Sequence, residues 1–143
     1  MTAAGSIDQV IDDFAVLDDW EERYRYIIEL GKELEPLADE ERNDRTKVRG
    51  CVSQVWLVSK AEPGPPPRLA FRGDSDAHIV RGLIALLFRL YDGKAADEIL
   101  KTDARAVFRR LGLEEHLSPQ RSNGFVSMVK RIQADAEAAM ASA

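Results

Sequence analysis

Two short stretches of the chain carry the pattern of β-strands, and a proline-rich connector joins them. Residues 52–58 are dense in β-branched and aromatic side chains, which suit a pleated and partly buried surface. Residues 68–72 alternate with a period of two, as a half-buried strand does. The connector, residues 62–67, holds four prolines, which cannot sit inside a sheet. We therefore predict an antiparallel hairpin, with residues 47–49 as a short third strand before it.

The widest apolar face of helical period lies in the middle of the chain. Residues 74–76, Asp-Ser-Asp, are a typical helix start, and Gly93 is a typical stop. Between them, apolar residues recur at helical spacing: Ile79, Val80, Leu83, Ile84, Leu87 and Leu90. This face predicts a central buried helix. Gly82 in its interior costs about 1 kcal/mol relative to alanine, which indicates that another element packs closely there.

Shorter helical patterns lie on both sides of this helix. They cover residues 7–14, 20–31, 95–100, 104–111 and a last helix that begins at Ser118-Pro119. From about residue 134 this helix fades into an alanine-rich tail, for which we predict fraying. The expected fold is α+β, a small antiparallel β-sheet of about three strands covered by helices on one face. We expect one domain over residues 1–143, since no repeat or linker divides the chain.

Composition narrows the class of protein. The chain has 143 residues, of which 45% are apolar and 31% are charged, an ordinary balance for one soluble domain. Its net charge of −5 argues against nucleic acid as the main partner. The longest apolar run, residues 83–88, is far shorter than the roughly 20 residues of a membrane span. No signal peptide is visible, so we expect a cytoplasmic protein that does not bind membranes.

Cys51 is the only cysteine of the chain and the strongest candidate for chemistry. Gly50 permits backbone conformations closed to other residues, so we expect Cys51 at the tip of the loop before the strand. The cations Lys47 and Arg49 lie close in sequence, and nearby positive charge favours thiolate over thiol. These features suit a nucleophile. The alternative is a buried structural cysteine, which is a common state of this residue.

A metal centre and a cysteine hydrolase are weaker interpretations of Cys51. A closed zinc or cluster site usually needs four ligands, and His78 and His116 do not stand in ligand spacing with it. A hydrolase needs a histidine base near the sulfur, and no hydrolase signature surrounds it. We interpret His78 as a first-turn helix residue and His116 as a surface loop residue. A lone cysteine cannot form an internal disulfide, which fits a reducing compartment.

Several blocks of the sequence resemble the SufE family of sulfur-acceptor proteins and follow that family's order. The block around the cysteine reads Gly-Cys-Val-Ser-Gln-Val-Trp, and the block at the last helix reads Leu-Ser-Pro-Gln-Arg-Ser-Asn-Gly. In full, the similar blocks are residues 50–56, 20–31, 73–77, 79–85 and 117–124. They extend from about residue 20 to about residue 128, so the resemblance covers almost the whole chain.

The resemblance implies a sulfur carrier in iron–sulfur cluster biosynthesis, with a fold like that of the cluster scaffold IscU. In the family, a pyridoxal-phosphate-dependent cysteine desulfurase holds sulfur from free cysteine as a persulfide. The implied role of Cys51 is to accept this sulfur from a SufS-like desulfurase, stimulate that enzyme, and deliver the sulfur to a SufBCD-like scaffold complex. We expect the chain itself to bind no cofactor and no metal, because the pyridoxal phosphate belongs to the desulfurase. We expect no independent turnover.

The resemblance also implies supporting residues. Arg121 matches the family's arginine in Ser-Pro-x-Arg-Ser-x-Gly, where it would bind the desulfurase or hold the Cys51 loop. A salt bridge at the helix entry is the alternative for Arg121. Asp74 lies in a block that adjoins the cysteine loop in the family. We expect it mainly to cap the following helix, with loop control as a second role. Ser53 and Gln54 are expected to form hydrogen bonds in the loop.

The resemblance also implies that the persulfide is shielded between transfers, by an apolar residue such as Val52 and by a pocket under the loop tip. Two other functions stay open. One is a partner that regulates a desulfurase without carrying sulfur. The other is the paralogous acceptor of a different desulfurase. The sequence does not decide between a monomer and a homodimer.

Overall fold

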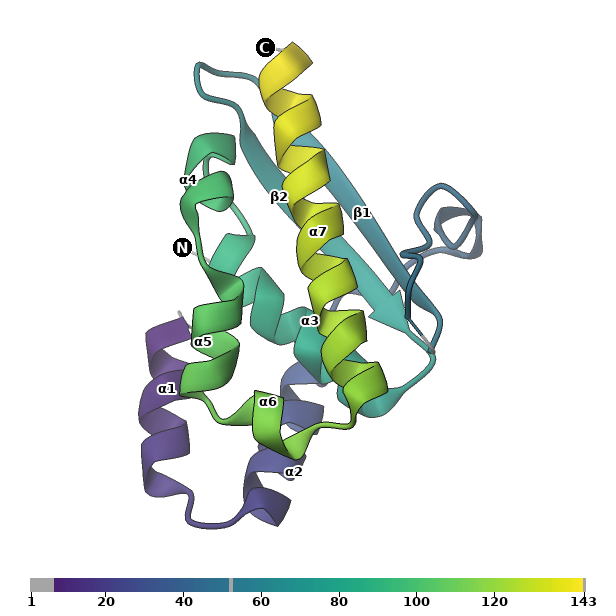
Figure 1. Ribbon diagram of the computed structural model, residues 1–143. Coiled ribbons are helices and arrows are strands. Elements are labelled where there is room, and N and C mark those ends of the chain that lie inside the picture. The colour runs from purple at the N-terminus through teal and green to yellow at the C-terminus, as the bar shows by residue number, and fades with distance from the viewer. Residues whose placement is uncertain (1–6, 52, 143) are drawn as a thin grey trace.

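A computed structural model describes residues 7–51 and 53–142 of the chain. Most of these residues are helical, and one long hairpin supplies the sheet (Figure 1). The helices and strands are α1 (Ile7–Val16), α2 (Trp20–Leu30), η1 (Gly31–Glu33), η2 (Asp39–Glu41), β1 (Val55–Glu62), β2 (Arg68–Ser75), α3 (His78–Tyr91), α4 (Ala96–Lys101), α5 (Ala104–Arg110), α6 (Leu113–His116) and α7 (Pro119–Ser142). The fold is α+β, as the sequence predicts.

The hairpin of β1 and β2 is antiparallel over its full length, with Val55 opposite Ser75 at one end. Alternate side chains of the two strands are buried: Val55, Leu57, Leu69 and Phe71. This period of two packs one face of the hairpin against the helices. The predicted hairpin is therefore confirmed, with the proline-rich residues as its connector.

The predicted third strand is wrong. Among the described residues the sheet has two strands, and Lys47 adds only an isolated antiparallel bridge to Trp56. A turn just before this bridge explains its shortness, because the side chain of Asn43 accepts hydrogen bonds from the backbone of Arg45 (2.8 Å) and Thr46 (3.1 Å). Such local side-chain bonds draw the chain away from an extended path.

The central helix of the fold is α3, which is buried along most of its length. It packs against α2, and the two helices lie very close together at Gly82. A Cβ atom added to Gly82 would lie 2.0 Å from the carbonyl oxygen of Ile27. The expected close packing at Gly82 is therefore confirmed, and it is backbone of α2 that fills the space.

The last helix, α7, is the longest helix in the described residues and runs alongside the hairpin of β1 and β2 (Figure 1). It is continuous to Ser142 and so includes the alanine-rich stretch from about residue 134 for which we predict fraying. Ala136 lies in that stretch and is fully buried. Helix α6 was not expected from the sequence, since its four residues are too few to show a period. None of the helices in the described ranges is both long and apolar enough to cross a membrane.

Candidate functional site

Cys51 lies on a short loop that the bridge between Lys47 and Trp56 closes at its base. The backbone N–H of Val48 donates to the carbonyl of Val55 at 2.8 Å, so the two ends of the loop are held together at its base. Gly50 has a φ of 92°, in the region that favours glycine. The predicted turn at Gly50 is confirmed.

The loop tip rests against α7. The Sγ atom of Cys51 lies 3.6 Å from the carbonyl oxygen of Gly124, to which the thiol donates a weak hydrogen bond. A Cβ atom added to Gly50 would lie 2.5 Å from the Oγ atom of Ser127. Both contacts are made by α7, so this helix is the surface on which the cysteine sits.

Burial decides the ionisation of Cys51. The residue is half-buried, and this desolvation raises the pKa of its thiol above the ordinary value. The cause of this shift is burial, and its direction is opposite to the one we expected from Lys47 and Arg49. Our expectation that these cations favour the thiolate is therefore wrong for the free protein. Burial of the sulfur, and not the charges near it in the sequence, sets the direction of the shift.

Alkylation of Cys51 by iodoacetamide should reflect this burial. An ordinary thiol has a pKa of about 8.5. In urea-unfolded protein we expect the alkylation rate to rise with pH through a midpoint near that value, and in the folded protein through a higher midpoint. The same shift makes Cys51 favour the folded state below pH about 8.5, and this contribution is lost as the pH rises through the folded pKa. Equal midpoints in the two states would contradict the prediction.

A cavity of about 290 Å³ opens beside the cysteine. Its lining combines the loop, α3 and the start of α7: Cys51, Ser53, Val80, Leu83, Ser118, Gln120, Arg121, Gly124 and Met128. The wall is mostly apolar, and its polar side chains are those of Arg121, Ser53, Ser118 and Gln120. The expected pocket under the loop tip is therefore present. Val52, the expected apolar shield, lies outside the described residues.

The structure brings some of the predicted site residues together and separates others. Ser53 and Arg121 line the same cavity as Cys51, and the backbone of Arg121 donates to the hydroxyl of Ser118 at 3.3 Å. Gln54 takes part through its backbone, whose N–H donates to the carboxylate of Asp76 at 3.0 Å. Lys47 and the exposed Arg49 are not among the residues that line the cavity.

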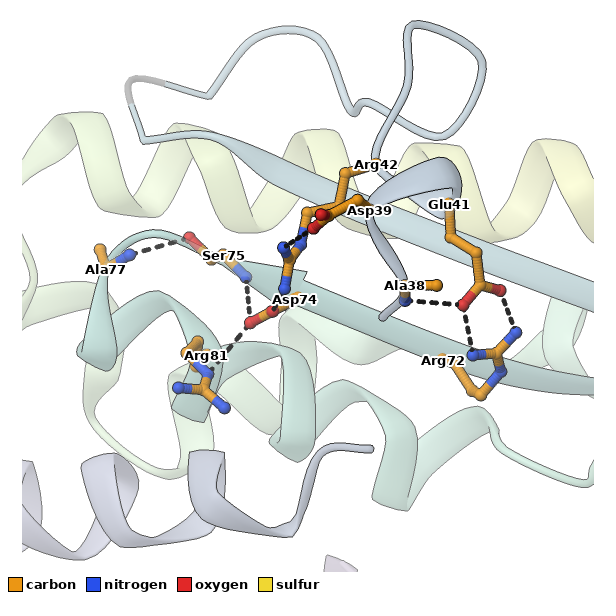
Figure 2. Close-up of polar contacts among 9 residues, drawn as sticks. All are labelled: Ala38, Asp39, Glu41, Arg42, Arg72, Asp74, Ser75, Ala77 and Arg81. Carbon is orange, nitrogen blue, oxygen red and sulfur yellow. Dashed lines mark hydrogen bonds and ion pairs between the residues drawn. The ribbon is translucent and has the colours of Figure 1, made fainter. Parts of the chain in front are cut away.

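Asp74 does not cap α3, so the expected capping role is wrong. The N-cap of α3 is Ala77, and Asp74 lies near the end of strand β2, opposite Trp56. Its buried carboxylate accepts a hydrogen bond from Arg42 at 2.9 Å and forms an ion pair with Arg81 at 3.1 Å (Figure 2). Asp74 thus joins the segment that precedes the cysteine loop to β2 and α3.

We predict that Asp74→Ala lowers the free energy of unfolding by about 2 kcal/mol, because it leaves two partly buried guanidinium groups without their carboxylate. Urea unfolding measures this loss. The matched control is Asp39→Ala, which removes an exposed carboxylate from the same Arg42 and should cost less than about 0.5 kcal/mol. Equal losses in the two variants would contradict the prediction.

A second ion pair holds the same segment. The carboxylate of Glu41 receives both terminal nitrogens of Arg72 and also the backbone N–H of Ala38, at 3.0 Å (Figure 2). These hydrogen bonds lower the pKa of Glu41 to about 2. Helix η2 is therefore fastened to β2 at two places, by Glu41 and by the neighbouring Arg42.

Sequence reasoning did not find the partners of Arg42, Arg81 and Asp76, which hold the approach to the loop and its far end. Their partners lie far away in the sequence: Asp76 is 22 residues from Gln54, and Arg42 is 32 residues from Asp74. The signal present in the sequence was the acidic run of residues 74–76, which we interpreted as a helix start. In the structure these carboxylates pair with side chains and backbone outside the helix start.

The two histidines lie away from the cavity lining. His78 begins α3, as expected. His116 is exposed, as expected, but ends the short helix α6, where its ring stacks on Trp20 with ring centroids 3.8 Å apart. Within residues 7–51 and 53–142, no three histidine, cysteine or acidic side chains gather as a metal site would require. The chemistry of the cavity thus centres on the cysteine.

Comparison with known proteins identifies the chain's relatives. It matches the family model "SufE: Fe-S metabolism associated domain" over residues 8–136. An uncharacterized SufE-like protein of Rhizobium etli is 58% identical over 133 residues, which cover 92% of this chain and 90% of that protein. Another of Rhizobium meliloti is 54% identical over 133 residues, 92% of this chain and 95% of that protein.

A solved structure shares the fold. The solution structure of a hypothetical protein from Thermus thermophilus has a TM-score of 0.75 to this chain, with 21% identity, and 94% of this chain and 96% of that chain are covered. The family model and the two relatives extend over nearly the full length, and the span of the family model includes the cysteine loop and the cavity. The chain therefore belongs to the SufE family, whose domain is associated with iron–sulfur metabolism.

Proposed function

We propose that this protein is a sulfur acceptor in iron–sulfur cluster assembly. Cys51 takes sulfur from the persulfide of a SufS-like cysteine desulfurase and passes it to a SufBCD-like scaffold complex. The observation that carries the proposal is the position of the sole cysteine, on a surface loop at the mouth of a cavity. A tip can enter a partner's active site, whereas a core cysteine cannot.

The transfer step conserves oxidation level. The thiolate of Cys51 attacks the outer sulfur of the desulfurase persulfide, a new S–S bond forms on Cys51, and the old S–S bond breaks. The leaving group is the desulfurase cysteine thiolate, and the transferred sulfur keeps its hydrogen. This is thiol–disulfide exchange with one sulfur replaced, so its rate depends on thiolate fraction and access.

The free protein is poorly set for this attack, because burial raises the pKa of Cys51. The loop must therefore leave its seat on α7, or the partner must supply the activating charge. Arg121 is placed to act in either case, since it lines the same cavity as Cys51. It would bind the desulfurase or hold the loop, and Arg121→Ala with unchanged partner affinity and unchanged sulfur uptake would reject both roles.

The test is the intact mass of the protein after incubation with a cysteine desulfurase and free cysteine, without reductant. We expect a gain of one sulfur atom, reversed by reductant. Since the chain has one cysteine, the gain also assigns the site. No gain, with the desulfurase demonstrably active, would contradict the acceptor role toward that enzyme. A desulfurase of another class would then separate a wrong partner from a wrong function.

The regulatory alternative draws on one observation, the half-burial of Cys51, which raises the pKa of its thiol. A protein that bound a desulfurase and altered its turnover through contact alone would have no need of an exposed thiol. The two functions differ in whether sulfur is found on the chain.

A further inference from the structure

Arg131 of α7 reaches across to the chain that leads into the cysteine loop. One terminal nitrogen of its guanidinium donates to the carbonyl of Arg45 at 2.6 Å, and the other donates to the carbonyl of Lys47 at 3.3 Å. Its Nε donates to the carboxylate of Asp135, one turn further along α7, at 3.4 Å. The guanidinium thus binds two backbone carbonyls and is oriented by a carboxylate of its own helix.

These two carbonyls belong to the open edge of the short bridge. Lys47 faces Trp56 on one side, where its neighbours Thr46 and Val48 form backbone hydrogen bonds with β1. On the other side no strand follows among the described residues, and an edge of this kind leaves carbonyls in need of donors. Arg131 supplies the donors, and because it is charged these are strong hydrogen bonds.

The far end of the loop has a separate fastening. The backbone N–H of Gln54 donates to Asp76, and the backbone N–H of Asp76 donates back to the carbonyl of Gln54 at 3.3 Å. Among the described residues of the tip, Gly50 and Cys51 lie against α7. The position of the cysteine on α7 therefore depends on where the two ends of the loop are held.

We propose that Arg131 is a positioning residue, which holds the entry to the cysteine loop against α7 and thereby keeps Cys51 seated at the cavity mouth. Arg131 contacts neither the sulfur nor the cavity, so it acts through the loop backbone. The effect of Arg131 on sulfur transfer rests on the proposed function. Its effect on the accessibility of the Cys51 thiol does not, because that accessibility can be measured on the free protein.

The test compares the iodoacetamide labelling rate of Cys51 in native buffer for four proteins: wild type, Arg131→Ala, Arg131→Lys and Lys130→Ala. We expect Arg131→Ala to label about tenfold faster, equivalent to about 1.4 kcal/mol of lost restraint. Lysine can reach only one carbonyl, so Arg131→Lys should show a smaller increase, about threefold. Lys130 is exposed on the same helix, and its removal controls for charge and should leave the rate unchanged.

Measuring the labelling rate at low concentrations of urea distinguishes labelling through loop release from labelling through global unfolding. Labelling through loop release should be almost independent of urea below the unfolding transition, whereas labelling through global unfolding should accelerate steeply. An unchanged rate in Arg131→Ala, an equal rise in Lys130→Ala, or a rise that follows global unfolding would each overturn the inference. Arg131→Lys keeps the test decisive if the alanine variant does not fold. Absence of sulfur uptake by the wild type would overturn the proposed function instead.

Discussion

Cys51→Ser, incubated with a cysteine desulfurase and free cysteine, should gain no sulfur, whereas the wild type gains one atom. Serine keeps the shape of the side chain, but its hydroxyl is not ionised at neutral pH and forms no stable bond to the transferred sulfur. The fold should persist, because Cys51 is half-buried and its bond to Gly124 is weak. Intact mass measures the gain, and urea unfolding should show a change of no more than about 1 kcal/mol.

The same variant decides between the two functions. If the protein carries sulfur, Cys51→Ser should bind the desulfurase but fail to raise its turnover of free cysteine, because the enzyme's persulfide is not removed. A regulator without a carrier role would stimulate equally well with serine at this position. Stimulation by Cys51→Ser equal to that by the wild type would therefore reject the proposed function.

Gly82→Ala should lower the free energy of unfolding by about 3 kcal/mol or more. On its own, alanine in a helix interior would stabilise by about 1 kcal/mol relative to glycine. Here its methyl group would lie 2.0 Å from the carbonyl oxygen and 2.6 Å from the carbonyl carbon of Ile27, so α2 and α3 must separate. Backbone atoms cannot turn aside as a flexible side chain can, and overpacking of this kind usually costs more than the propensity gains. Urea or thermal unfolding measures the loss.

Gly93→Ala is the matched control for Gly82→Ala. Gly93 has a φ of 77° and no atom within 4 Å of an added Cβ, so alanine there meets a conformational cost but no contact. We expect a loss of about 1–2 kcal/mol. A loss at Gly82 no larger than that at Gly93 would show that the helices adjust, and it would contradict the close approach in the structure.

Elements with a sustained period could be predicted from the sequence. The hairpin shows a period of two on both sides of a proline-rich connector, and α3 shows a wide apolar face. Gly82 was correctly interpreted as a close approach because glycine in a buried helix has a cost that only packing offsets. The third strand was wrong because a strand of three residues has no period to read. Its length was set by a turn at Asn43, whose side chain competes for the backbone.

The candidate site was predicted in part. The motif around Cys51 and the motif around Arg121 mark residues that meet at one cavity, although about seventy positions separate them. The state of the thiol could not be predicted from its sequence neighbours, because burial against α7 is a property of the folded chain. The partners of Asp74 and the contact from Arg131 escaped prediction for the same reason. Each of these contacts joins residues from different elements, and a single sequence does not show which residues of different elements come together.

The seat of Cys51 on α7 has a consequence for the lifetime of the protein under oxidative stress. Peroxide attacks thiolates, and an oxidised cysteine is protected from irreversible sulfinic acid mainly by a second thiol that condenses with it. This chain has no second cysteine. In the free protein, burial raises the pKa of the only thiol and so lowers the fraction of thiolate that a small oxidant can attack. The contact of Cys51 with α7 thus favours the chemical durability of a protein that has no second cysteine to condense with an oxidised first one.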